Sequence, residues 1–262
     1  MKNDASPFNL TGRTALITGS TQGIGFAMAE ALAMAGANIV LNGTSSPKSA
    51  QPSVNALKQS GREVWYCQSD LSKPGSAHVL FKEAVSYAGH IDILISNASV
   101  QNFNSFLDVT EEEMDYQFAT NFKSSFILIQ CATAAMLKKG WGRIVTIGSV
   151  QEENHNPSFA VYGALKAAQT HFIKGLARAY SKNGITFNNI APGFIDTRRN
   201  TDFLGDPQNV AKMLAKIPAN RVGVPEDCGG AALLLCSDAS SYITGTNLFI
   251  DGGLRLKTDP NK

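Results

Sequence analysis

The chain has 262 residues, of which 44% are hydrophobic and 17% charged, and its formal net charge is +2. These values are typical of a globular protein with a sizeable core, and the near-neutral balance gives no support for nucleic acid or an anionic membrane as a partner. No apolar run reaches membrane-spanning length, and the start of the chain lacks the apolar stretch of a signal peptide. The four cysteines have no metal-ligand spacing and lie in apolar runs, which favours reduced thiols in the cytoplasm.

Short apolar runs rich in β-branched residues alternate with helical patterns along the whole chain. They predict strands at residues 14–18, 38–42, 63–67, 91–96, 143–149, 186–190 and 248–251. The helical patterns between them include two long ones, at 110–139 and 158–181. This alternation predicts one α/β domain over residues 1–262, a doubly wound Rossmann-like fold whose seven-stranded parallel sheet carries helices on both faces. We expect residues 1–11 to form a loose leader and residues at about 194–220 a mobile substrate loop.

A glycine-rich segment lies between the first predicted strand and the first helix. It runs from Gly19 through Gly23 to Gly25. In a strand–loop–helix context such glycines let the backbone approach a pyrophosphate on the amino end of the helix. The spacing Gly-x-x-x-Gly-x-Gly differs from the commoner Gly-x-Gly-x-x-Gly, so a tight turn without a ligand remains an alternative.

The choice between NAD and NADP depends on the end of the second strand. An acid there suits the ribose of NAD, and an arginine suits the 2′-phosphate of NADP. The chain has Asn42 followed by Gly43 and Thr44, and its nearest cation is Lys48. Because no cation is clearly placed to bind the 2′-phosphate, we favour NAD over NADP. Asp70, after the third strand, either faces the cofactor or caps a helix.

The fifth strand ends at Ser149, and Tyr162 and Lys166 follow four residues apart on one helix. Free tyrosine titrates near ~10, so use as a base near neutrality requires lowering its pKa by about 3 units, or about 4 kcal/mol. An ammonium about 6 Å away supplies about 3 kcal/mol at an effective dielectric of about 20. Taken alone, a Tyr-x-x-x-Lys pair is more often an exposed helical pair. Asn121, in the middle of the helix at 110–139, is either exposed or held there for a purpose.

In this order and spacing, these motifs resemble the classical short-chain dehydrogenase/reductase family over essentially the whole chain. Ser96-Asn97-Ala98-Ser99 is similar to the family's Asn-Asn-Ala-Gly, with serines at both ends. The resemblance implies a catalytic tetrad of Asn121, Ser149, Tyr162 and Lys166. Tyr162 would be the acid/base, Lys166 would lower its pKa and hold the nicotinamide ribose, Ser149 would position the substrate oxygen, and Asn121 would hold a water.

The resemblance also implies which residues bind the nicotinamide cofactor. They are Gly19, Thr21, Gln22, Gly23, Ile24, Gly25, Asn42, Thr44, Asp70, Leu71, Asn97, Ala98, Tyr162, Lys166, Pro192, Gly193, Ile195 and Thr197. Family members are usually homotetramers or homodimers, formed through the two long helices. The four histidines are scattered, so we expect no metal site.

The segments expected to line the substrate pocket are strongly polar, which favours a small hydroxylated substrate such as a sugar, polyol or sugar acid. The expected substrate residues are Ser149, Gln101, Gln151, Tyr162, Phe194 and Arg198. The alternative is that many of these side chains point to solvent. The Asn42-Gly43 ending and Gln101 also resemble 3-hydroxybutyrate dehydrogenases, but the lysine that those enzymes carry before the tyrosine is missing. Two further hypotheses are a 3-oxoacyl-carrier-protein reductase using NADPH and a non-catalytic cofactor-binding scaffold.

Overall fold

A computed structural model describes residues 6–256 and confirms the doubly wound α/β architecture. Seven parallel strands form one sheet in the order β3-β2-β1-β4-β5-β6-β7. The strands are β1 Thr14–Ile17, β2 Asn38–Gly43, β3 Val64–Gln68, β4 Ile93–Ser96, β5 Gly142–Ile147, β6 Ile185–Pro192 and β7 Asn247–Ile250. The main helices are α1 Gly23–Met34, α2 Pro47–Lys58, α3 Ser76–Ala88, α4 Glu111–Gln117, α5 Ser124–Lys139, α6 Ala160–Tyr180, α7 Thr201–Leu204, α8 Pro207–Leu214 and α9 Gly229–Cys236.

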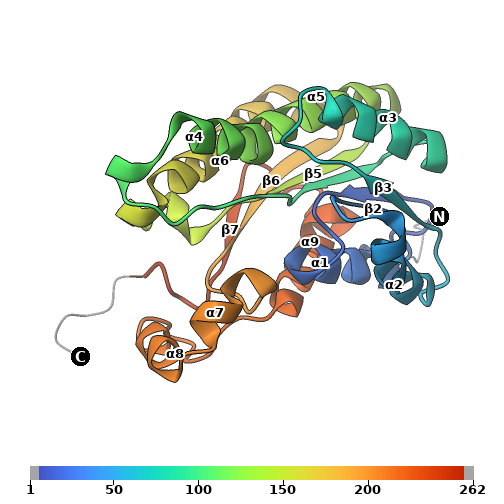
Figure 1. The fold of residues 1–262 in the computed structure, drawn as a ribbon. Coiled ribbons are helices and arrows are strands. Elements are labelled where there is room, and N and C mark those ends of the chain that lie inside the picture. The colour runs from blue at the N-terminus through green and yellow to red at the C-terminus, as the bar shows by residue number, and fades with distance from the viewer. Residues whose placement is uncertain (1–5, 257–262) are drawn as a thin grey trace.

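Helices cover both faces of the sheet (Figure 1). Successive strand residues point to opposite faces, so each buried strand contributes to two cores. Ile17 of β1 packs in the core shared with α1, α2 and α9, whereas Leu16 packs in the core under α3, α5 and α6. Burial on both faces explains why the strands are continuous apolar runs without polar alternation. The strand order reverses between β1 and β4, which places a ligand-binding crevice at their carboxyl ends.

The long helix expected at residues 110–139 is interrupted. Its predicted capping box is present, with Thr110 and Glu113 each bonded to the other's backbone amide. Between α4 and α5, however, residues Phe118–Lys123 form a π-helical turn. Such turns are concentrated at functional sites, and this one contains Asn121.

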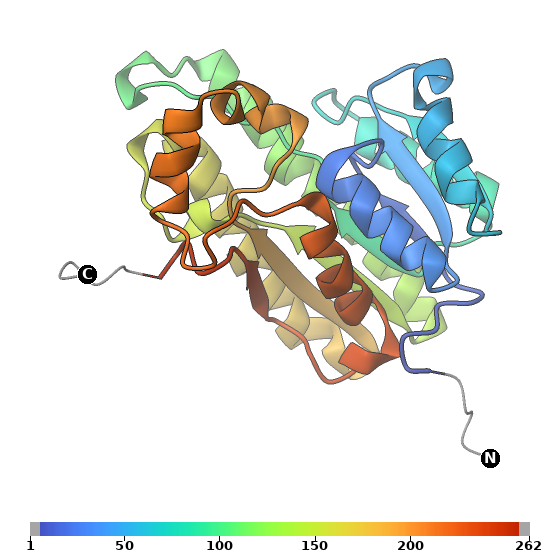
Figure 2. The same ribbon diagram turned by 90° about the horizontal axis from the view of Figure 1, so that it is seen from below.

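Two predicted loops contain ordered contacts. Residues 1–5 of the leader lie outside the described residues, and residues 6–9 are exposed. Leu10 is only 1% exposed and its amide donates to the carbonyl of Ala35 at 2.8 Å, which anchors the end of the leader. The looseness of the leader before it stays a prediction. The segment at 194–220 contains a 3-10 helix at Arg198–Asn200 followed by α7 and α8, which stand beside the sheet (Figure 2). Its mobility stays a prediction.

Within residues 6–256, no helix is long and apolar enough to cross a membrane. The four cysteines are free thiols, and three of them are buried. Burial raises the pKa of Cys67, Cys228 and Cys236 to about 12, so these thiols are protonated and unreactive at neutral pH.

Candidate active site

The carboxyl end of β5 and the first turns of α6 bring Ser149, Tyr162 and Lys166 together. Tyr162 and Lys166 are 6% and 2% exposed, which rules out an ordinary surface pair. The Lys166 ammonium donates to the carbonyl of Ile147 at 2.5 Å and lies 5.6 Å from the centroid of the Tyr162 ring. A lysine that buries its charge beside a buried tyrosine indicates a chemical task, because burial penalises the charged form of each group.

Burial changes the pKa values in a way that the sequence argument did not anticipate. It raises the pKa of Tyr162, while the charge of Arg199 and hydrogen bonds from Ser149 and Arg199 act in the opposite direction. It also lowers the pKa of Lys166 to about 7, with the charge of Arg199 adding to the effect. Desolvation is the largest cause of the shift at both groups in the cofactor-free protein. The lowering of the Tyr162 pKa by Lys166 stays a prediction.

Arg199 lies in the 3-10 helix after β6, and its side chain reaches across the crevice to the loop after β4. Its guanidinium donates to the Ser99 carbonyl at 2.8 Å, to Ser99 Oγ at 3.2 Å and to Gln101 Oε1 at 3.5 Å. The predicted substrate residue was Arg198. Arg198 and Arg199 are both exposed, and within residues 6–256 only Arg199 makes side-chain hydrogen bonds to the loop after β4. A contact of Arg198 with the substrate stays a prediction. Consecutive residues of a 3-10 helix point about 120° apart, and sequence alone could not choose between them.

Glu152 was missed by the sequence argument. Its carboxylate accepts from the Ser149 amide at 2.9 Å, Asn189 Nδ2 at 3.1 Å, Thr170 Oγ1 at 2.7 Å and Asn247 Nδ2 at 3.0 Å. It therefore connects the loop after β5 to α6, β6 and β7. The signal was present, since Ser149 and Glu152 form a capping box.

The glycine loop has the geometry of a phosphate cradle. Gly19 and Gly23 have φ values of +59° and +58°, a region that side chains disfavour. A Cβ on Gly25 would lie 2.5 Å from the Gly19 carbonyl, so only glycine fits there. Gln22, the residue before α1, makes no side-chain cap, and the first amides of the helix remain free for an anion. The loop therefore fits the pyrophosphate of a dinucleotide.

Asn97 and Ala98 join the loop after β4 to the glycine loop. Asn97 Nδ2 donates to the carbonyls of Thr18 and Gly19, both at 2.9 Å, and the Asn97 and Ala98 amides donate to Thr18 Oγ1 at 2.9 Å. The serine that replaces the family's first asparagine has its own partner. Ser96 Oγ donates to Ser125 Oγ at 2.9 Å, which also accepts from Gln169 at 2.9 Å. This network explains how the loop is held despite the departure from the family motif.

Asn121 is buried in the π-helical turn, at 2% exposure. Its side chain accepts from the Val100 amide and donates to the Val100 carbonyl, both at 2.8 Å. The alternative of an exposed residue is therefore wrong. The paired bonds fix the loop that carries Gln101 to the π-helical turn. The binding of a water at Asn121 stays a prediction.

Two of the expected cofactor residues also make bonds within the protein. Asn42 is 1% exposed; its Oδ1 accepts from the Gly19 amide and its Nδ2 donates to the carbonyls of Cys67 and Ser69. Turning to the ribose would cost it these bonds. Asp70 Oδ1 accepts from the amide and hydroxyl of Ser72 at 3.0 and 2.7 Å, and this bonding lowers the pKa of Asp70. The contacts of both residues with the cofactor stay predictions.

The other expected cofactor residues border the crevice. Ile195 pairs with Gly223 in an isolated parallel bridge that fixes the segment after β6. A Cβ on Gly23 would meet Thr197 Cγ2 at 3.6 Å, so Thr197 faces the glycine loop across the crevice. Of the remaining residues, Thr21 lies in the glycine loop, Ile24 in the first turn of α1, Thr44 after β2, Leu71 after β3, and Pro192 and Gly193 at the end of β6.

Comparison with known proteins decides the family. Residues 19–255 match the family described as Enoyl-(Acyl carrier protein) reductase. A 3-oxoacyl-[acyl-carrier-protein] reductase from Vibrio cholerae is 37% identical over 95% of this chain and 99% of its own length. A short-chain type dehydrogenase/reductase from Mycobacterium marinum is 32% identical and superimposes with a TM-score of 0.88 over 95% of this chain and 98% of that one. The chain belongs to the short-chain dehydrogenase/reductase family.

Relatives of this dehydrogenase/reductase differ in their substrates. An L-rhamnose 1-dehydrogenase (NAD(P)(+)) from a Sphingomonas species is 32% identical over 94% of this chain and 97% of its own. Among solved structures, a 3-oxoacyl (acyl-carrier-protein) reductase from Agrobacterium tumefaciens with NADP bound is 36% identical, with a TM-score of 0.91 and coverage of 96% and 97%. A gluconate 5-dehydrogenase from Burkholderia cenocepacia in complex with NADP and tartrate is 32% identical, with a TM-score of 0.90 and coverage of 96% and 98%. This dehydrogenase/reductase is therefore an oxidoreductase that moves a hydride between a pyridine nucleotide and a CH–OH or carbonyl carbon.

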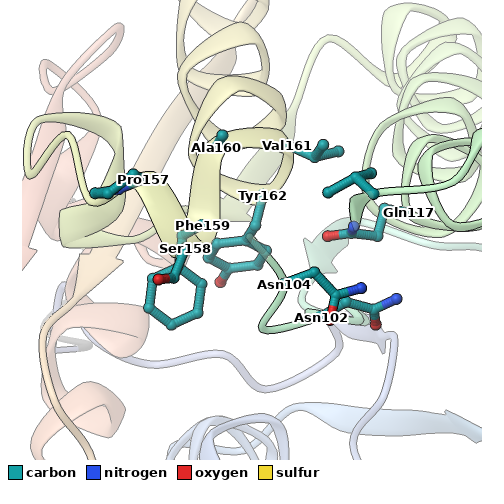
Figure 3. Close-up of a pocket in the computed structure, with 10 residues that line it drawn as sticks. Asn102, Asn104, Gln117, Pro157, Ser158, Phe159, Ala160, Val161 and Tyr162 are labelled. Carbon is teal, nitrogen blue, oxygen red and sulfur yellow. The ribbon is translucent and has the colours of Figure 1, made fainter. Parts of the chain in front are cut away.

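The substrate side of the dehydrogenase/reductase is less polar than expected. Figure 3 shows Tyr162 beside Phe159, with Asn102, Asn104 and Gln117 across the pocket. Asn102 and Asn104 donate to Glu113, so part of the polar wall is used internally. The rings of Phe103 and Phe159 meet edge to face at 4.3 Å.

Proposed function

We propose that this enzyme interconverts a secondary alcohol and a ketone on a small hydroxylated substrate such as a sugar, polyol or sugar acid. The observation that carries the proposal is the convergence of hydrogen-bonding side chains around Tyr162. Ser149 and Arg199 both act on the pKa of Tyr162, and Arg199 donates to Gln101 Oε1 at 3.5 Å. Phe103 and Phe159 add an aromatic wall, which suits the apolar face of a sugar.

The residues divide the proton transfer among them. The bound nicotinamide supplies the hydride acceptor in oxidation and the hydride donor in reduction. Ser149 Oγ holds the substrate oxygen, and in oxidation Tyr162 takes the hydroxyl proton as the hydride leaves the carbinol carbon. The Lys166 ammonium and the Arg199 guanidinium stabilise the tyrosinate form. In reduction Tyr162 returns the proton to the carbonyl oxygen.

The cofactor loops tolerate the 2′-phosphate of NADP. Asn42 is turned inward, so no acid repels a phosphate at the end of β2. Ser45, Ser46 and Lys48 are exposed at the start of α2, where helix amides favour an anion. We therefore propose that the enzyme accepts NADP as well as NAD. The preference for NAD stays a prediction, and it gains no support from the relatives whose names include NADP.

We further propose a homotetramer or homodimer in the cytoplasm, formed through α4, α5 and α6. Met114, Tyr116, Phe118 and Phe126 are 55%, 46%, 40% and 40% exposed along α4, the π-helical turn and α5. Phe126 stacks on Phe172 of α6 at 5.1 Å, so the apolar surface continues from one helix to the next. Light scattering during gel filtration tests the assembly, and a monomer would contradict it. The buried free thiols suit the reducing cytoplasm.

A second candidate is a 3-oxoacyl-carrier-protein reductase using NADPH, favoured by the 37% identical Vibrio cholerae relative. Against it, the glycine loop has the neutral Gln22 where a basic residue is expected. The test is a panel of sugars, polyols, hydroxy acids and 3-oxoacyl thioesters, assayed with both cofactors by absorbance of the reduced nicotinamide. Turnover of polyols or sugar acids supports the proposal, and turnover of acyl thioesters alone favours the reductase. Cofactor binding without turnover would indicate a scaffold.

A further inference from the structure

Arg199 is a cation at the reaction centre whose hydrogen bonds go to neutral partners. Its acceptors are the carbonyl and hydroxyl of Ser99 and the amide oxygen of Gln101. Two other arginines have a carboxylate partner: Arg143 pairs with Asp238 at 2.9 Å, and Arg221 pairs with Asp227 at 2.7 Å. Within residues 6–256, no carboxylate lies within ion-pair distance of Arg199.

A guanidinium whose present partners are all neutral binds a carboxylate more strongly than it binds those partners. Its planar fork matches the two oxygens of a carboxylate, and the bonds are stronger because both groups are charged. Its contact with Gln101 is long, at 3.5 Å, so little is lost when an anion replaces it. Arg199 is exposed on a 3-10 helix and can adjust its position without disturbing the sheet.

We propose that Arg199 binds a carboxylate of the substrate, so that the preferred substrates are hydroxy acids and oxo acids and not neutral alcohols. Because Arg199 spans from the segment after β6 to Ser99 in the loop after β4, a carboxylate bound by it lies in the crevice between these loops. This inference rests on the proposed function and narrows its substrate class. A phosphate of the cofactor is the competing anion, and the test separates the two sources.

The experiment compares wild type with R199Q, R199K and R198Q. Each enzyme is assayed with 2- and 3-hydroxy acids, aldonic acids, their neutral methylamides and polyols. R199Q is expected to lower kcat/KM for the acids about 10- to 100-fold, as loss of a charge-assisted hydrogen bond implies. The methylamides and polyols should change less than about threefold, and R199K should retain part of the activity toward acids. R198Q removes the same charge one residue away, and a loss of acid turnover in R198Q equal to that in R199Q would overturn the assignment to Arg199.

Two binding measurements decide the inference even without turnover. Fluorescence titration with reduced cofactor should give the same Kd for R199Q and wild type; a weakened Kd would assign Arg199 to the cofactor phosphate and overturn the inference. Calorimetry with malonate on the cofactor complex should show binding by wild type and none by R199Q. Equal malonate binding, or equal loss of acid and methylamide turnover, would also overturn it. Failure of the proposed function has a different signature, namely no turnover of any alcohol or ketone with either cofactor.

Discussion

The Glu152 carboxylate accepts the backbone amide of Ser149 at 2.9 Å, which attaches the catalytic serine to the interior of the protein. The same carboxylate accepts from Thr170, Asn189 and Asn247, and all four donors are neutral. Glu152 therefore works as a positioning residue for the loop after β5, and its negative charge also acts on Tyr162 and Lys166.

Replacing Glu152 by glutamine is expected to destabilise the fold. The NH2 group of the glutamine would face N–H and O–H groups that now donate to the carboxylate. The loss should be about 1–3 kcal/mol in the free energy of unfolding, measured by chemical denaturation. Burial is the main cause that raises the pKa of Tyr162, and Glu152 adds to it. E152Q should therefore also move the acid limb of the oxidation pH profile to lower pH.

The neighbouring Glu153 provides the control for that variant. It is exposed and lies 3.7 Å from Arg255, a surface contact of small energetic value. E153Q should change neither the unfolding free energy nor the pH profile. Equal effects of E152Q and E153Q would mean that the buried network has no special role.

Buried Lys166 is expected to destabilise the cofactor-free protein below neutral pH. Its pKa is about 7 when folded and 10.5 when unfolded, so the unfolded chain binds more protons and stability rises with pH between these values. The cost of burial at low pH corresponds to about 5 kcal/mol at most. K166M should be more stable than wild type at pH 6, and this advantage should shrink by pH 9. A difference in Tm that does not depend on pH would contradict the shifted pKa.

Lys166 is also assigned a contact with the nicotinamide ribose. K166A is therefore expected to weaken cofactor binding as well as the rate, whereas a purely electrostatic role would affect the rate alone. Fluorescence titration with reduced cofactor measures the first effect and steady-state assay the second. An unchanged Kd would show that Lys166 does not contact the ribose.

Cofactor selection is expected to depend on Lys48. If it contacts the 2′-phosphate, K48A should lower kcat/KM for NADP about 10-fold, as one charge-assisted contact implies, and leave NAD unchanged. Lys58, at the other end of α2, provides a matched control as K58A. If the wild type prefers NAD tenfold and K48A does not alter this preference, the prediction that NAD is the preferred cofactor holds and Lys48 does not select it.

The sequence predicted the architecture because parallel strands buried on both faces leave an unmistakable apolar pattern, as β1 and β5 show. It also placed Ser149 at a strand end and Tyr162 and Lys166 on one helix, as the structure has them, while their roles with Asn121 as a catalytic tetrad stay a prediction. It could not predict that Arg199 bonds to the loop after β4, because that depends on a single 3-10 turn. The inward turn of Asn42 was equally hidden, since its partners Cys67 and Ser69 lie in and directly after another strand. The burial that raises the pKa of Tyr162 was hidden too, because burial is a property of the whole fold.

The most direct test of the account is the turnover of Y162F compared with wild type on the best substrate of the panel, followed by nicotinamide absorbance at saturating cofactor. General acid–base catalysis contributes about 100- to 10,000-fold, so Y162F should lose at least about 100-fold in kcat while its Kd for reduced cofactor stays within about twofold of wild type. A Y162F enzyme that keeps more than about a tenth of the wild-type rate would show that Tyr162 is not the proton-transferring residue.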